Sequence, residues 1–304
     1  FLAAHAEKLA ADHGMAARVL SEAETRKLNM GAFLSVGQGS EQQPHFIVLE
    51  HNKTLLEDTV PLVLVGKAIT FDTGGYSMKS AKGMAEMKTD MAGGAAVMGA
   101  LEAAARLQVP YPVVGIVPAT ENMISGQASR PSDVVRASNG KTIEIVNTDA
   151  EGRLILADAL VYAARYKPAA VIDLATLTGS AVVALGEGCA AALFTDDREL
   201  AQRLSRASQS SGERIWRMPL YPEYAEWMRS SNVADLRNIP SNRYAGVGTS
   251  AAFLKEFTEG SRWAHLDIAP MASLPASKVV KPLGPAGATG FGVRLLAHMM
   301  LDGD

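Results

Sequence analysis

Short apolar runs alternate with long helical patterns along this chain, and that alternation limits the folds it can adopt. The apolar runs are HFIVLEH, VPLVLVG, YPVVGIVPAT, AAVIDLATL and WAHLDIAP, each bounded by proline, glycine or polar residues as buried strands are. Helical patterns cover residues 90–107, 152–166, 198–211 and 249–260, and the chain closes with TGFGVRLLAHMML. This order predicts an α/β fold, with a central mixed, largely parallel β-sheet sandwiched between helices in a single domain.

The chain contains no internal repeat and no long linker that would divide its 304 residues. Its first segment, FLAAHAEKLAADHGM, carries charge throughout and predicts an amphipathic helix, not a secretory signal. We therefore expect a linker-like helix over residues 1–16 and one large domain over residues 17–304.

Composition argues against several classes of partner. The net charge of −3 provides no basic excess for nucleic acid, and no apolar run reaches the roughly 18 residues that cross a membrane. The single cysteine, Cys189, fits a reducing compartment, so we expect a cytoplasmic protein. Its small-residue surroundings, GEGCAAALF, predict a buried thiol.

Two polar stretches follow predicted strands, at the position where open α/β sheets bind ligands. GKAITFDTGGYSMKSAKGMAEMKTD follows VPLVLV, and NTDAEGR follows KTIEIV. Taken alone, Asp149 and Glu151 fit simple helix capping, because acids in the first turn offset the helix dipole. Asp90, which precedes another helical pattern, could also be a cap.

A second interpretation follows if Asp72, Asp90, Asp149 and Glu151 converge at the strand ends. Four carboxylates in a partly buried cluster repel one another, and most would have to protonate. Two divalent cations would balance all four negative charges. Oxygen ligands suit Mg²⁺ or Mn²⁺, and also Zn²⁺ when a site is rich in carboxylates. A paired-metal site of this kind can activate a water between the ions.

Five motifs together resemble the catalytic domain of the leucyl (cytosol) aminopeptidase family, the M17 metallopeptidases. They are VGKAITFDTGG, EMKTDMAGG, NTDAEGRL, DLATLTG and ATGFGVRLL. The octapeptide NTDAEGRL is the signature of that family and is intact here. The resemblance runs from about residue 17 to the end of the chain, and five motifs in the family's order argue against a chance match.

The resemblance implies two divalent metal ions, zinc or manganese, with magnesium or cobalt as alternatives. One ion would be held by Asp72, Asp149 and Glu151. The other would be held by Lys67, Asp72, Asp90 and Glu151, so that two carboxylates bridge the pair. As a ligand Lys67 must be a neutral amine, which requires the metal to depress its pKa far below the free value near 10.4.

The resemblance also implies two catalytic residues. Lys79 matches a lysine that is kept as an ammonium and stabilises the oxyanion of the tetrahedral intermediate. Arg153 matches the second catalytic residue, and its guanidinium cannot act as a base. In the family a bicarbonate bound at this arginine is the general base.

The implied substrates are peptides with a free N-terminus, whose first side chain would enter a pocket near Met87, Thr176 and Gly179. A thioether wall accepts varied apolar shapes and favours leucine or methionine. From the sequence alone, Met87 fits a core residue better, and only the resemblance places it in the pocket. Pro270 stands where the family usually has glycine, which would reshape a loop at this pocket.

The resemblance further implies a homohexamer, and the family's additional N-terminal domain has no counterpart in this sequence. Two other functions compete with a peptidase: a silent, DNA-regulatory homologue of the same fold, and a two-metal phosphatase. A silent homologue is expected to lose ligands, whereas all seven metal and catalytic positions are present here. A lysine ligand and the octapeptide do not suit a phosphatase.

Overall fold

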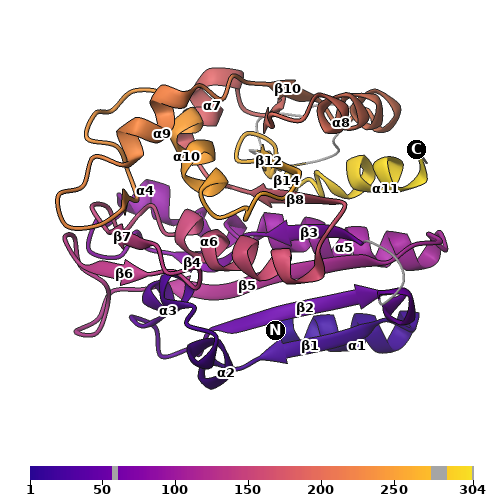
Figure 1. Cartoon of the computed structure of the whole chain (residues 1–304), viewed down its shortest axis with the longest axis horizontal. Coiled ribbons are helices and arrows are strands. Elements are labelled where there is room, and N and C mark those ends of the chain that lie inside the picture. The colour runs from indigo at the N-terminus through magenta and orange to yellow at the C-terminus, as the bar shows by residue number, and fades with distance from the viewer. Residues whose placement is uncertain (57–60, 275–285, 303–304) are drawn as a thin grey trace.

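The computed structural model describes residues 1–56, 61–274 and 286–302 (Figure 1). Its centre is a nine-stranded sheet in the order β1-β2-β5-β3-β8-β12-β9-β10, with β4 also paired to β5. The strands of this sheet are β1 (Ala16–Leu20), β2 (His45–His51), β3 (Leu62–Gly66), β4 (Ala68–Asp72), β5 (Val113–Asn122), β8 (Ala170–Ala175), β9 (Ala191–Phe194), β10 (Ile215–Arg217) and β12 (Trp263–Asp267).

The sheet is mixed, and most of its pairs are parallel. Strands β5, β3, β8 and β12 run parallel to one another, as do β4 with β5 and β9 with β10. The pairs β1–β2, β2–β5 and β12–β9 are antiparallel. The five apolar runs of the sequence correspond to β2, β3, β5, β8 and β12, which confirms the predicted fold class. Strand β1 escaped prediction because its residues are mostly exposed or half-buried.

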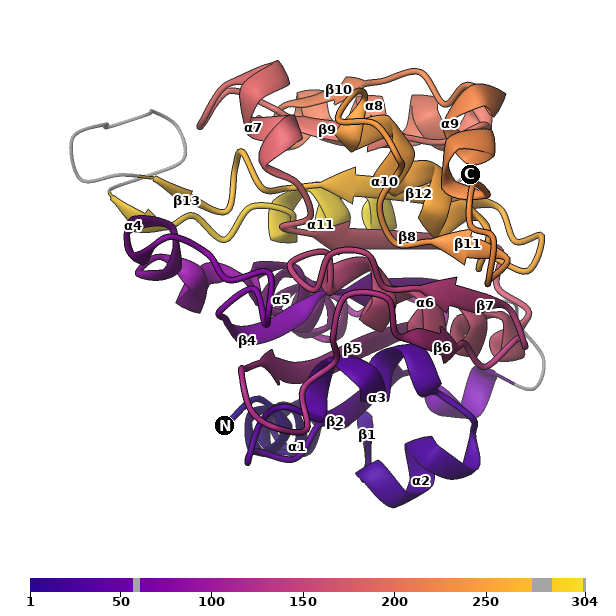
Figure 2. The ribbon, with the colours of Figure 1, turned by 90° about the vertical axis from the view of Figure 1, so that its left-hand side faces the viewer.

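Helices cover both faces of the sheet (Figures 1 and 2). Helices α1, α5, α8 and α11 pack on one face, and α3, α6 and α10 pack on the other, so that two apolar cores form. The helices are α1 (Leu2–His13), α2 (Glu22–Lys27), α3 (Gly31–Gly37), α4 (Ala81–Met84), α5 (Ala92–Arg106), α6 (Gly152–Ala163), α7 (Gly179–Leu185), α8 (Arg198–Ser211), α9 (Pro222–Met228), α10 (Gly246–Lys255) and α11 (Val293–Leu301). Short 3-10 turns occur at η1 (Lys53–Leu55), η2 (Met87–Thr89) and η3 (Ala164–Tyr166).

Helix α1 belongs to the first of these cores. Its buried side chains Leu2, Ala6, Leu9 and Ala10 join residues of α5 and β2 there. The helix ends at Gly14, whose left-handed backbone terminates it with a hydrogen bond to Ala10. The division of the chain at residue 16 stays a prediction.

Two small sheets stand apart from the central one. The first has the order β11 (Leu236–Arg237), β7 (Thr142–Glu144), β6 (Val134–Arg136), and the second pairs β13 (Ser273–Leu274) with β14 (Gly287–Ala288). The run KTIEIV, predicted as the strand before NTDAEGR, does contain a strand, β7, but this strand belongs to a separate sheet. It pairs with its hairpin partner β6 and with the distant β11.

The prediction of a buried thiol at Cys189 was wrong, since its side chain is exposed. Small residues surround it in the sequence, but Gly186 and Gly188 both have positive φ and form a turn after α7. The backbone N–H of Gly188 donates to the carbonyl of Pro270 at 2.7 Å, which fixes this turn at the surface.

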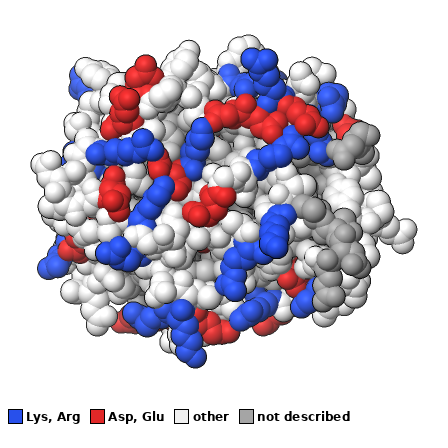
Figure 3. Space-filling view, in the orientation of Figure 1, with Lys and Arg blue, Asp and Glu red and all other residues white. Residues whose placement is uncertain are grey.

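Charged side chains of both signs lie next to one another on the face shown in Figure 3. This mixture agrees with a net charge of only −3 for the chain. Among the described residues, no helix is both long and apolar enough to cross a membrane.

Helix α5 approaches the sheet unusually closely through its first turn. A Cβ atom added at Gly93 would lie 2.1 Å from the carbonyl oxygen of Leu174 and 2.9 Å from the backbone nitrogen of Lys67. The N–H of Gly94 donates to the carbonyl of Lys67 at 2.7 Å. Glycine at residue 93 thus permits β3, β8 and α5 to meet directly beside Lys67.

We expect Gly93→Ala to destabilise the fold by about 1–3 kcal/mol, because the added methyl group collides with backbone that cannot move aside locally. Thermal unfolding of the purified chain measures the change. Gly126→Ala is the matched control, since a Cβ there has no neighbour within 4 Å among the described residues. Equal melting temperatures for the two variants would contradict the close packing of α5.

Candidate active site

The candidate site lies where the parallel strands end at their carboxyl termini (Figure 2). Lys67 directly follows β3, and Asp72 is the last residue of β4. Thr176 follows β8, and Asp90 lies between η2 and α5. Parallel strands bring their carboxyl ends to one edge of the sheet, so these residues meet although they are far apart in sequence.

Lys67 is buried and connects two of the predicted ligands. Its Nζ lies 2.9 Å from Asp90 Oδ2 and 2.8 Å from Glu151 Oε1, and it donates to the carbonyl of Thr176 at 3.0 Å. The Thr176 hydroxyl in turn donates to Asp90 Oδ1 at 2.7 Å. A Cβ at Gly152 would lie 2.6 Å from Lys67 Nζ, so glycine in the octapeptide leaves room for the lysine.

Lys79 connects the other two acids. Its Nζ lies 2.8 Å from Asp72 Oδ2 and 2.5 Å from Asp149 Oδ1. The second oxygen of Asp72 accepts hydrogen bonds from the N–H of Gly74 at 2.9 Å and from Asn122 Nδ2 at 2.8 Å. Asp72 is thus held from both sides at the end of its strand.

Burial and the neighbouring charges strongly shift the pKa values of the groups in this cluster. Burial raises the pKa of Glu151 to about 8 and that of Asp90 to about 6, against the pull of Lys67. Burial also raises the pKa of Asp149. Burial disfavours the charged forms of Lys67 and Lys79, but the surrounding carboxylates outweigh it and raise the pKa of both lysines above the ordinary range. Four acids face two ammonium groups, so negative charge remains in excess.

Simple helix capping does not account for the acids. Glu151 occupies the N-cap position of α6, yet its side chain makes no capping hydrogen bond and faces Lys67 instead. Asp90 precedes Met91, the N-cap residue of α5, and Asp90 Oδ1 accepts from Thr176. Both carboxylates contact the ammonium of Lys67.

The donor set fits a divalent cation. Asp72, Asp149 and Glu151 each offer an oxygen, and the three atoms lie within 4.8 Å of one another. Asp90 Oδ2 and Asp149 Oδ1 are buried and, over the described residues, have no hydrogen-bond partner beyond a lysine ammonium. Asp90 is not part of this group of three, but Lys67 contacts both Asp90 and Glu151 and so connects Asp90 to the group.

Arg153 is buried in the first turn of α6, where its Nη1 donates to the carbonyl of Asn238 at 2.6 Å. Its Nε has no hydrogen-bond partner in the part of the chain that is described. Burial lowers the pKa of Arg153 to about 10, although Glu151 and Asp267 favour the charged form. Arg153 therefore lies near the acids and retains one unused buried donor.

A cavity of about 1010 Å³ opens onto the acids and both lysines. The three residues predicted for the substrate pocket, Met87, Thr176 and Gly179, all line it. Its other wall is largely apolar and includes Met91, Ala95, Val182, Ala269, Ala272, Leu274, Phe291 and Val293. Pro270 is not among its lining residues, although its neighbour Ala269 is. A single cavity thus contains charged and apolar parts.

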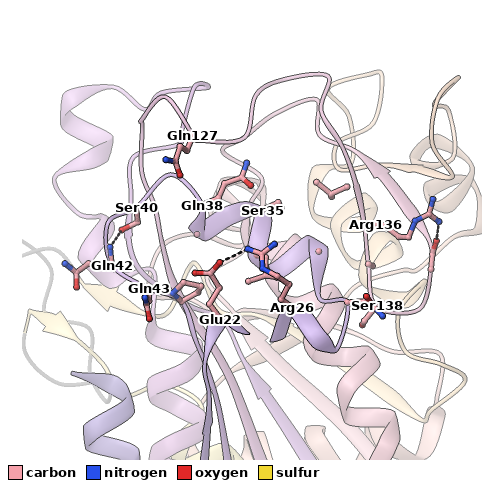
Figure 4. Close-up of a pocket in the computed structure, with 18 residues that line it drawn as sticks. Glu22, Arg26, Ser35, Gln38, Ser40, Gln42, Gln43, Gln127, Arg136 and Ser138 are labelled. Atoms are coloured by element: carbon pink, nitrogen blue, oxygen red, sulfur yellow. Dashed lines mark hydrogen bonds and ion pairs between the residues drawn. The ribbon is translucent and has the colours of Figure 1, made fainter. Parts of the chain in front are cut away.

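Another cavity, of about 920 Å³, lies at α2, α3 and the β6–β7 hairpin (Figure 4). Its two arginines have partners: Arg26 Nη2 lies 2.6 Å from Glu22 Oε1, and Arg136 Nη1 donates to the carbonyl of Gly140 at 2.8 Å. None of the ten residues predicted for the site lines this cavity.

Sequence reasoning missed several polar residues around the site. Asn122 Nδ2 donates to Asp72 Oδ1 and also to the Thr148 carbonyl at 3.0 Å. Asp267 accepts from the Thr178 hydroxyl at 2.7 Å. Asn122 and Asp267 end β5 and β12, so the rule that ligands gather at strand ends could have found both. Asn238 follows a two-residue strand and has no comparable signal.

The sequence matches known proteins along nearly its whole length. Residues 1–297 match the family model described as the cytosol aminopeptidase family, catalytic domain. A probable cytosol aminopeptidase of Geobacter sp. (strain M21) is 52% identical over 300 residues, which are 99% of this chain and 60% of that protein. Proteins of the same name from Geobacter sulfurreducens and Chloroherpeton thalassium are each 51% identical and are covered over 59% and 55% of their lengths.

These relatives are longer than the chain described here, which spans 60% or less of each of the three. The matched part nevertheless includes every segment that contributes to the acidic cluster and to the cavity beside it. The chain belongs to the cytosol aminopeptidase family and carries the family's catalytic domain.

Proposed function

We propose that this chain is a metal-dependent aminopeptidase that removes the N-terminal residue from peptides, with leucine and other apolar residues preferred. The observation that carries this proposal is the convergence of four acids and two lysines at the charged end of one cavity with a largely apolar wall. Membership of the family supports the same activity.

Five residues would hold two divalent ions, Zn²⁺ or Mn²⁺, with Mg²⁺ or Co²⁺ as alternatives. Asp72, Asp149 and Glu151 form one set, and Lys67, Asp72, Asp90 and Glu151 form the other. When bound, such a pair supplies a water activated as a nucleophile and Lewis-acid polarisation of the scissile carbonyl. As a ligand, Lys67 would have to give up the proton that the carboxylates otherwise retain on it.

Lys79 is the electrophile of the proposed reaction. Its ammonium lies between Asp72 and Asp149, at the junction of the acids and the cavity. The two carboxylates keep it protonated, so it can donate to the oxyanion that develops on the substrate. The acids are then occupied as ligands, and none of them is free to serve as a general base.

Arg153 would bind a bicarbonate that acts as the general base. Its unused buried Nε–H supports an anion at this position, since a buried donor without a partner is costly. The guanidinium itself stays protonated and holds the anion in place.

The cavity accounts for the proposed substrates. Met87, Thr176 and Gly179 would contact the side chain of the first residue, and the thioether adapts to different apolar shapes. A free, neutral N-terminal amine could bind one of the divalent ions directly, whereas an acylated nitrogen could not. We also propose a cytoplasmic homohexamer, as the resemblance implies.

Removal of metal is expected to abolish hydrolysis of leucine p-nitroanilide by the purified chain, and restoring Mn²⁺ or Zn²⁺ is expected to recover it. N-acetyl-leucine p-nitroanilide is the control and should not be cleaved, because its nitrogen is blocked. Absence of activity with metal demonstrably bound would shift the proposal to a binding role for this domain.

Lys79→Ala is expected to lower turnover by about 10²–10³-fold, the usual effect of removing one donor to an oxyanion, and to leave metal content unchanged. Lys82→Ala is the matched control, because Lys82 is exposed on the nearby α4 and does not line the cavity. Measurement of kcat together with metal analysis tests both variants. Equal turnover in the two would exclude Lys79 as the electrophile.

Asp90→Ala is expected to reduce the bound metal from about two ions per chain to about one, because Asp90 belongs to only one of the proposed ligand sets. Metal analysis after dialysis measures the ratio. Glu86→Ala removes an exposed acid from the wall of the same cavity and should retain both ions. Two ions per chain in the Asp90 variant would disprove this ligand set.

A further inference from the structure

A buried asparagine, Asn238, holds together the chain segment on which the proposed site depends. It is fully buried and follows β11, whose parallel pairing with β7 brings residue 238 beside the end of β7. The N–H of Asn238 donates to the carbonyl of Glu144 at 3.0 Å, so the pairing continues for one residue beyond the strand. Asn238 thus stands at the beginning of residues 145–151, the loop that carries Asp149 and Glu151.

The side chain of Asn238 continues the hydrogen bonding to this loop beyond the point where the backbone pairing ends. Its Oδ1 accepts from the N–H of Val146 at 2.8 Å and of Asn147 at 3.2 Å. Its Nδ2 donates to the carbonyl of Asn147 at 2.6 Å and to that of Ala150 at 3.4 Å. An amide side chain has two acceptor positions and two donors, and all four are used on this one loop.

The backbone of Asn238 reaches the other functional group. Its carbonyl accepts from Arg153 Nη1 at 2.6 Å. One residue therefore fixes both the loop before α6 and the arginine in the first turn of α6. The opposite side of the loop is fixed separately, because the Thr148 hydroxyl donates to the carbonyl of Gly74 at 2.6 Å and accepts from the N–H of Ser77 at 2.8 Å.

We propose that Asn238 is a positioning residue that holds residues 145–151 and Arg153 as one unit in the arrangement the metal site needs. Asn238 contacts neither the cavity nor any of the five proposed ligand side chains among the described contacts, so it acts through the backbone of the loop. The predicted effect on metal affinity rests on the proposed function. The positioning of the loop rests only on the hydrogen bonds of Asn238.

Asn238→Ala is the variant that tests the proposal, because it removes the four side-chain bonds and leaves the carbonyl that holds Arg153. We expect the dissociation constant for Zn²⁺, measured by competition with a chromophoric chelator, to rise by about 10–100-fold, as is typical when groups that orient ligands are lost. We expect kcat to fall more than KM rises. Asn238→Ser, which retains a hydroxyl, is the second variant if the first does not fold, and its effect should be smaller in the same direction.

Hydrogen exchange of the metal-free chain supplies a readout that does not depend on metal or activity. The amides of Val146 and Asn147 should exchange faster in the variant, while those of β8 should keep their wild-type rates. Asn232→Ala is the matched control, since Asn232 is exposed in the same part of the chain, and it should change neither exchange nor metal affinity.

The outcomes separate this inference from the proposed function. A wild-type metal affinity and unchanged exchange at residues 145–151 in a folded Asn238 variant would overturn the positioning role. Faster exchange at every buried strand would also overturn it, because Asn238 would then support the whole fold and not the loop. Local loosening of the loop in a chain whose wild type has no peptidase activity would retain the positioning role and reject the aminopeptidase proposal.

Discussion

The buried ammonium of Lys67 is the interaction on which the rest of the site depends. It joins Asp90, which lies before α5, to Glu151, which lies before α6, and the two helices pack on opposite faces of the sheet. Without a cation between them, these buried carboxylates would repel one another or protonate. The close approach of α5 at Gly93 and the absence of a side chain at Gly152 provide the space that this lysine occupies.

Excess negative charge makes the site suited to binding cations. Two lysines neutralise four acids only in part, and burial raises the pKa of Glu151 to about 8. A fold normally avoids such a cluster, because buried charges without partners are destabilising. The cluster is explained if divalent cations complete the charge balance. The adjacent cavity would then hold a substrate next to these cations. Stability and function are thus coupled through the same carboxylates.

The polar residues around the cluster are held by strand ends on one side and by a distant segment on the other. Asn122 ties Asp72 to the loop that carries Asp149, through bonds to Asp72 Oδ1 and the Thr148 carbonyl. Asn238 ties the other side of that loop to β11. A well-positioned loop matters here, because losing groups that orient ligands typically lowers metal affinity by about 10–100-fold.

The sequence by itself determined the fold class and the identity of the clustered residues. Apolar runs and helical periodicity indicate from the local sequence which residues are buried. In motifs such as NTDAEGRL the functional residues lie within a few positions of one another, so the sequence alone identifies them. Tertiary structure alone decided that β7 leaves the main sheet, that Cys189 is exposed, and that Asn238 supports the loop before α6. Each of these depends on pairing between segments far apart in the chain, and local spacing contains no information about which distant backbone groups will meet.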